Sequence, residues 1–100
     1  MNVQITSRKF KCRDSLKEFI TNELKTLEKY NDEILESEVI LHFTHVKDSI
    51  KTAEINLTIP GKVFSASEES PEFEKSVTLA VEKIKSQLKK IKSKRLTRVK

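Results

Sequence analysis

The sequence is poor in the residues on which many sites depend: its 100 residues include one cysteine, one glycine, two prolines and no tryptophan. The single cysteine, Cys12, excludes an internal disulfide and any metal site built from several cysteines. The single glycine, Gly61, excludes a glycine-rich phosphate-binding loop. Apolar runs are too short to cross a membrane, and the first residues lack the pattern of a signal peptide. We therefore expect one small cytoplasmic domain.

Positive charge is concentrated at the two ends of the chain. The formal net charge is +5, but residues 1–13 carry +4, residues 14–82 carry −8 and residues 83–100 carry +9. Segregation of this kind favours a polyanionic partner more than uniform basicity does. The alternative is that the last segment is simply a solvated, lysine-rich helix end.

Alternating apolar and polar residues predict four strands, over about residues 2–8, 39–44, 53–59 and 63–67. Apolar residues at helical spacing predict two helices, over about residues 15–30 and 71–92. Ser15 and Glu18 have the spacing of a capping box for the first helix. Ser70 is the predicted N-cap of the second helix, with Pro71 at its first position.

The element order β-α-β-β-β-α predicts an α+β two-layer sandwich. Each helix has one apolar stripe, and the economical way to bury both is on one face of a four-stranded sheet. Two short turns make the last three strands an antiparallel meander. The opposite face stays open to water, and the residues expected on it are Gln4, Thr6, His42, Thr44, Glu54, Asn56 and Thr58.

No pattern in the sequence indicates catalysis. His42 and His45 are three residues apart in a strand, so they point to opposite faces and do not chelate one metal. A nucleophile pair of Cys12 with a distant histidine, or an acid–base pair among the glutamates around the start of the second helix, would need a proximity that no spacing provides. We predict a non-enzymatic protein with no catalytic residues, no metal and no cofactor.

The last helix carries the strongest functional signal. With Ile84 at the centre of its apolar stripe and about 100° per residue, the lysines fall into two rows beside that stripe. One row contains Lys85, Lys89 and Lys92, and the other contains Lys83, Lys90 and Lys94. Two rows of ammonium groups can follow two lines of phosphates, with binding that weakens steeply as salt rises.

Residues 8–13 form a second basic cluster, which leaves the end of the first strand and could lie near either end of the second helix. Lys17, Lys25 and Lys29 lie off the apolar stripe of the first helix but alternate with acidic residues, so they are weaker candidates. The open sheet face is not expected to stack unpaired bases, because no aromatic residue is clearly placed there.

Several segments, in this order and spacing, resemble one known family. They are residues 1–8, residues 14–20 with the following Leu24, Leu27 and Tyr30, residues 59–61, residues 66–67 and, most strongly, residues 81–92. The chain resembles the ribosome hibernation promoting factors, also called ribosome-associated inhibitors or sigma-54 modulation proteins. The resemblance covers nearly the whole chain.

This resemblance implies a fold like that of double-stranded-RNA-binding domains. It also implies binding to the small ribosomal subunit, alone or within the 70S ribosome, in the channel of mRNA and tRNA. There the protein would inhibit translation by steric occlusion and protect idle ribosomes in stationary phase or stress. Contacts to 16S rRNA would come from basic residues on both helices. The RNA-binding residues that the resemblance implies are Lys83, Lys89, Lys90 and Lys92, with Arg8, Lys17, Lys25 and Lys29 as weaker members. The two helical rows add Lys85 and Lys94 to the predicted RNA-binding set.

The chain departs from the family pattern at the start of the second helix. Glu74 stands where a tyrosine is usual, and Lys75 and Ser76 replace small apolar residues. We expect a short form, with one ribosome-binding domain over residues 1–94 and a flexible basic tail over residues 95–100. The effect on ribosome pairing, the physiological trigger and the role of Cys12 stay open.

Two other functions remain as alternatives. One is general binding of double-stranded RNA, and the other is peripheral membrane binding through the basic tail. The tail has only Leu96 and Val99 as apolar anchors, which argues against membrane binding. Off the ribosome we expect a monomer.

Overall fold

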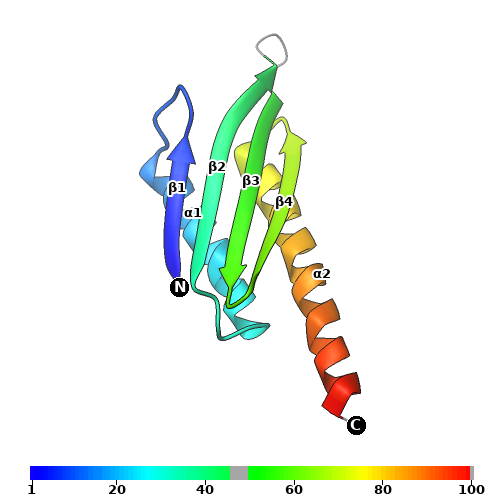
Figure 1. The fold of residues 1–100 in the computed structure, drawn as a ribbon. Coiled ribbons are helices and arrows are strands. Elements are labelled where there is room, and N and C mark those ends of the chain that lie inside the picture. The colour runs from blue at the N-terminus through cyan, green and yellow to red at the C-terminus, as the bar shows by residue number, and fades with distance from the viewer. Residues whose placement is uncertain (46–49, 100) are drawn as a thin grey trace.

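The chain folds into a four-stranded sheet with both helices on one of its faces (Figure 1). The computed structural model describes the backbone of residues 1–45 and 50–99 and the side chains of residues 1–43 and 50–91. The elements are β1 (Asn2–Ser7), α1 (Asp14–Lys25), the 3₁₀ helix η1 (Thr26–Lys29), β2 (Glu36–His45), β3 (Ile50–Ile59), β4 (Lys62–Ser70) and α2 (Phe73–Val99). The predicted β-α-β-β-β-α order and two-layer sandwich are confirmed.

The strands lie side by side in the order of the sequence, β1-β2-β3-β4. β1 is parallel to β2 because α1 carries the chain back along the sheet between them. The β2–β3 and β3–β4 pairs are antiparallel, which confirms the predicted meander. Gly61 makes the turn between β3 and β4 with a φ of 78°, a left-handed conformation that glycine adopts without steric strain.

Strand alternation separates a buried face from an open face, as predicted. Val39, Leu41, Ile55 and Leu57 have no exposed surface and meet the apolar stripes of the two helices. The predicted outward positions with described side chains are all exposed or half-buried: Gln4, Thr6, His42, Glu54, Asn56 and Thr58. The side chain of Thr44 lies outside the described residues.

The first helix starts differently from the prediction. It begins at Asp14, with Arg13 as N-cap and no side-chain hydrogen bond at that position. The capping box of Ser15 and Glu18 was therefore wrong, because the N-cap is Arg13, two residues before Ser15, and Ser15 lies inside the first turn of the helix. The α-helix ends at Lys25, and the predicted span is completed by η1.

The second helix begins two residues later than expected, so Pro71 precedes it. The reason is that β4 extends to Ser70, which still pairs with Lys51 of β3. Ser70 nevertheless supports the helix start, since its hydroxyl accepts a hydrogen bond from the Glu72 N–H at 3.2 Å. Ser76, one turn into α2, donates to the Lys51 carbonyl at 2.7 Å and lies 2.7 Å from the Ser70 hydroxyl.

α2 continues to Val99, beyond the predicted end near residue 92. The physical reason is local composition, because residues 83–99 contain no glycine or proline and are rich in lysine and arginine, which favour helix. Figure 1 shows the C-terminal half of α2 projecting past the end of the sheet. In the part of the chain that the structure describes, no helix is long and apolar enough to span a membrane.

Candidate nucleic-acid interface

The lysines of α2 flank the buried stripe that holds the helix on the sheet. Ile84 and Leu88 lie in the core at 0% and 2% exposure. Lys85 and Lys89 lie on the flank that faces the end of α1, beside Tyr30. Lys83 lies on the flank that faces β4, where it contacts Glu68. The structure thus places these lysines on the two flanks that helical geometry predicted.

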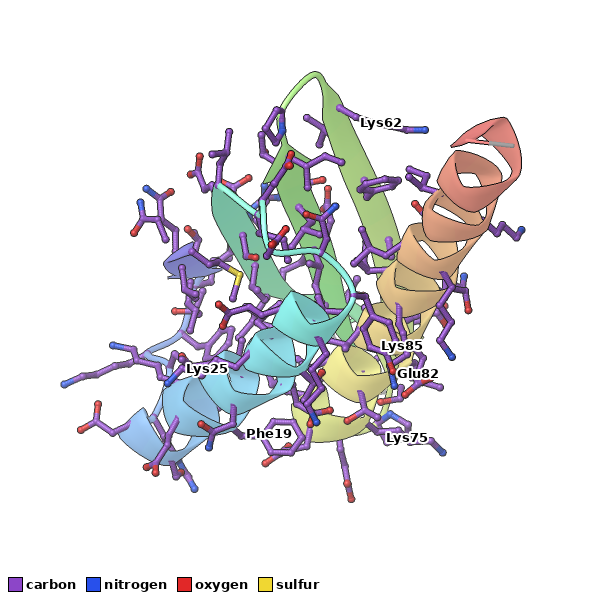
Figure 2. All side chains as sticks on the ribbon, turned by 90° about the horizontal axis from the view of Figure 1, so that it is seen from below. Phe19, Lys25, Lys62, Lys75, Glu82 and Lys85 are labelled. Atoms are coloured by element: carbon purple, nitrogen blue, oxygen red, sulfur yellow. The ribbon has the colours of Figure 1, made fainter. Side chains whose placement is uncertain are left out.

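Tyr30 organises the flank toward α1. Its half-buried ring lies under two ammonium groups, with the Lys85 Nζ 5.7 Å and the Lys89 Nζ 5.4 Å from the ring centre. Cation–π contacts of this length orient lysine side chains while leaving their N–H groups available to an anion. Lys85 also donates to the Glu82 carboxylate at 3.2 Å, and Figure 2 shows both residues on α2.

The α2 lysines differ in how far carboxylates neutralise them. Lys83 forms an ion pair with Glu68 of β4, and Lys85 forms one with Glu82 a turn earlier. Lys89 and Lys90 form no ion pair with any residue whose side chain is described, and both are exposed. The positive charge of Lys89 and Lys90 is therefore more available to an anion than that of Lys83 and Lys85. The side chains of Lys92 and Lys94 lie outside the described residues.

The lysines of the first helical segment are spread over different surfaces. Lys29, at the end of η1, is next to Tyr30 in the chain and lines the same cleft as Leu88 and Ile91 of α2. Figure 2 shows Lys25 on the side of α1 away from α2. Lys17 lies at the start of α1, close enough to Cys12 to influence its thiol. Of Lys17, Lys25 and Lys29, it is Lys29 that lines a surface shared with α2.

The basic segment of residues 8–13 lies at the other end of the molecule. The Phe10 ring stacks on Phe73 at the start of α2, with ring centres 5.0 Å apart, and Phe43 completes a three-ring cluster. At 1.5 Å per residue, the start of α2 is roughly 24 Å from Lys89 along the helix axis. Arg8 therefore does not lie with Lys85 and Lys89. Residues 8–13 lie near the N-terminal end of α2, a choice between its two ends that the sequence left open.

Two further exposed lysines were not among the predicted RNA-binding residues, Lys75 in the first turn of α2 and Lys62 at the start of β4. Lys75 is seven and fourteen residues before Glu82 and Lys89, and Figure 2 shows it on the same side of α2 as Glu82. The seven-residue spacing could have identified it. Lys62 is the first residue of β4, with its Nζ 5.1 Å from the Phe64 ring centre. No sequence signal connected this residue with α2.

A cleft of about 310 Å³ lies beside the lysine group. Its lining comes from residues 28–32, at the end of η1 and just beyond it, and from Leu88 and Ile91 of α2. Tyr30 belongs both to this lining and to the contacts with Lys85 and Lys89.

A nucleophile pair of Cys12 with His42 is not assembled, and the side chain of His45 lies outside the described residues. Cys12 is buried in the core, whereas His42 lies on the open face of the sheet, so the sheet separates them. Burial raises the pKa of the Cys12 thiol, which disfavours the nucleophilic thiolate. Among the residues that the structure describes, no group of three histidine, cysteine or acidic side chains gathers as metal ligands.

The open face of the sheet is acidic, in contrast to the lysine-rich flanks of α2. Its described strand positions include Glu36, Glu38, Glu54 and Glu69 and no lysine or arginine. Phosphates are therefore repelled from this face and attracted to the lysines on the second half of α2.

Comparison with known proteins gives one family. A family model described as sigma 54 modulation protein / S30EA ribosomal protein matches residues 3–96. A curated relative from Deinococcus radiodurans, a ribosome hibernation promotion factor, is 24% identical over 92 residues, which is 90% of this chain and 48% of the relative. The chain thus spans about half the length of that relative.

Solved structures agree on the fold. A ribosomal subunit interface protein from Coxiella burnetii superposes with a TM-score of 0.83 at 29% identity, covering 93% of this chain and 99% of the other. The N-terminal domain of Protein Y from Thermus thermophilus gives a TM-score of 0.81 at 24% identity, covering 91% and 99%. The second likeness concerns the fold alone.

Proposed function

Because this chain belongs to the sigma 54 modulation protein / S30EA ribosomal protein family, we propose that it is a ribosome hibernation factor. It binds the small subunit, free or within the 70S ribosome, and contacts 16S rRNA. By filling the channel of mRNA and tRNA it prevents translation sterically, without catalysing a reaction. It acts in the cytoplasm as a monomer and protects idle ribosomes in stationary phase or stress.

The observation that supports this proposal is the unpaired positive charge on the second half of α2. Lys89 and Lys90 are exposed and lack an ion pair among the described residues, while Lys85 and Lys89 are oriented by Tyr30. Each ammonium group that meets an rRNA phosphate releases condensed counterions, which is the main driving force of such contacts. Lysine is a good helix former, so these residues are compatible with the helix in which they lie.

The polarity of the molecule supports one orientation on RNA. The lysines on the second half of α2 bind the phosphates, and the open sheet face with its glutamates points away from them. A general binder of double-stranded RNA would use the same lysines, so their geometry does not separate it from a ribosome-specific protein. The separation comes from competition between ribosomes and isolated duplexes.

The test is co-sedimentation with vacant 30S, 50S and 70S particles at low and high salt. We expect the protein in the 30S and 70S fractions at low salt, and its release as salt rises. Protein that stays at the top of the low-salt gradient contradicts the proposal. Equal competition by isolated RNA duplexes favours the general RNA binder. A cryo-EM map of the 70S complex tests the channel position directly.

A further inference from the structure

We propose that the cleft beside Tyr30 holds one unpaired nucleobase of the RNA whose phosphates the α2 lysines bind. The inference deepens the proposed function, on which it rests, by giving the phosphate-binding surface a site that contacts a base. Its starting observation is position: Tyr30 forms part of the cleft lining and also lies under the Lys85 and Lys89 ammonium groups.

The size and mixed walls of the cleft suit a flat ring with polar edges. Ligand sites commonly range over about 300–1,000 Å³, so a cleft of about 310 Å³ suits a small group such as a single base. Leu88, Ile91 and the Tyr30 ring supply apolar and aromatic wall. Stacking of a base on an aromatic side chain contributes about 1–3 kcal/mol and accepts any base.

The two carboxylates of the cleft favour a base over a phosphate, whereas Lys29, which also lines it, adds to the positive charge available to the phosphate. Glu28 and Asp32 line it, and their carboxylates repel phosphate but accept hydrogen bonds from the N–H groups of a base edge. Guanine presents a ring N–H next to an amino group, which makes it the best match for a carboxylate. Uracil, with a single ring N–H, is the poorest match.

The neighbouring lysines supply the other half of a nucleotide site. The Lys89 and Lys85 Nζ atoms lie 5.4 and 5.7 Å from the Tyr30 ring centre, a span comparable with the phosphate-to-base separation within one nucleotide. A nucleotide can therefore place its phosphate at the lysines and its base against Tyr30. The Glu28 and Asp32 carboxylates disfavour the reverse orientation, with the phosphate in the cleft and the base at the lysines.

The experiment uses the fluorescence of Tyr30, which is the single tyrosine of a chain without tryptophan. The protein is titrated with a single-stranded RNA tetranucleotide containing guanosines, with a uridine tetranucleotide, and with an abasic ribose-phosphate chain of the same length and charge. We expect quenching by the guanosine RNA at concentrations several-fold lower than by the uridine RNA, and little by the abasic chain. Equal quenching by all three, or by none, overturns the inference.

A matched pair of variants separates the cleft from charge in general. Asp32→Asn and Glu33→Gln remove the same charge from adjacent exposed residues, but only Asp32 lines the cleft. We expect Asp32→Asn to reduce the preference for the guanosine RNA over the abasic chain several-fold, and Glu33→Gln to leave it unchanged. If both variants behave alike, the cleft does not bind the base.

Failure of this inference is distinguishable from failure of the proposed function. Salt-sensitive co-sedimentation with ribosomes, without base-dependent quenching, overturns the nucleobase site and leaves ribosome binding in place. Base-dependent quenching without co-sedimentation supports the site and contradicts the ribosomal role.

Discussion

Lys83 of α2 and Glu68 of β4 form an ion pair that joins the second helix to the edge strand of the sheet. The Lys83 side chain is 59% exposed and that of Glu68 is 21% exposed, so water screens much of the attraction. Exposed pairs of this kind contribute about 0–1 kcal/mol to folding. The pair matters more for function, because it occupies a lysine of the proposed RNA-binding surface.

Glu68→Gln should release Lys83 and strengthen ribosome binding. We expect affinity at low salt to rise by about two- to fivefold through one further phosphate contact, with the free energy of unfolding changed by less than about 1 kcal/mol. Equilibrium binding to vacant 30S subunits and urea unfolding measure the two effects. Glu69→Gln is the control, since Glu69 is the next residue of β4, is exposed and forms no ion pair with a described residue. Equal effects of both variants would show that only net charge changed.

Reversal of charge at Lys89 and Lys90 should weaken ribosome binding by about tenfold or more and flatten its salt dependence, since each lost phosphate contact lowers the logarithmic slope by about 0.7–0.9. Both side chains are exposed, so the fold should stay intact, as circular dichroism would show. The double reversal at Lys9 and Lys11 makes the same change in charge at the opposite end of the molecule. Unchanged affinity after Lys89→Glu with Lys90→Glu would contradict the site.

Leu88→Ala should destabilise the protein by about 2–5 kcal/mol, because it leaves a cavity in the core under the lysine surface. Leu88 is 2% exposed, whereas Leu79 on the same helix is 38% exposed. Leu79→Ala should therefore change stability by only about 0.5 kcal/mol. Thermal or urea unfolding of the two variants measures the difference, and similar losses would contradict the packing of α2 described above.

Ser76→Ala should cost about 1–2 kcal/mol of folding stability, because the half-buried Lys51 carbonyl and the buried Ser70 hydroxyl each lose a hydrogen-bond partner. Ser76 is fully buried, donates to the Lys51 carbonyl at 2.7 Å and lies 2.7 Å from the Ser70 hydroxyl. Ser86→Ala makes the same chemical change at an exposed site of α2 and should be neutral or slightly stabilising. Equal urea midpoints for both variants would contradict the role of this network.

Cys12 should react slowly with thiol reagents in the folded protein and rapidly in urea. Burial raises the pKa of its thiol above the ordinary value of 9.0, while Lys17 opposes the rise and Asp14 adds to it. The folded state then holds the proton to higher pH than the unfolded state. The resulting stabilisation is complete below pH 9.0 and is lost as pH rises through that value toward the raised pKa. Cys12→Ala should remove this part of the alkaline decline, measured as unfolding free energy against pH.

Much of the fold could be predicted because burial imposes a period on the sequence. Alternation along residues 53–59 and the helical stripe through Ile84 each allow one buried face, and together they require two layers. Helix starts were less predictable. The Ser15–Glu18 spacing suggested a cap, but α1 begins at Asp14, and Pro71 lies before α2 because β4 extends to Ser70. The residue at which α2 begins depends on how far β4 pairs with β3, and the spacing of residues within one segment does not predict that pairing.

By itself, the sequence determined the two flanks of lysines, because helical geometry relates residues within one segment. Only the tertiary structure decided which lysines remain available. It paired Lys83 with Glu68, placed Tyr30 under Lys85 and Lys89, and carried residues 8–13 to the far end of α2. These contacts join segments far apart in the chain, and their positions follow from how the helices pack on the sheet. The clefts and free charges of a surface depend on that packing, which no periodicity within a single element encodes.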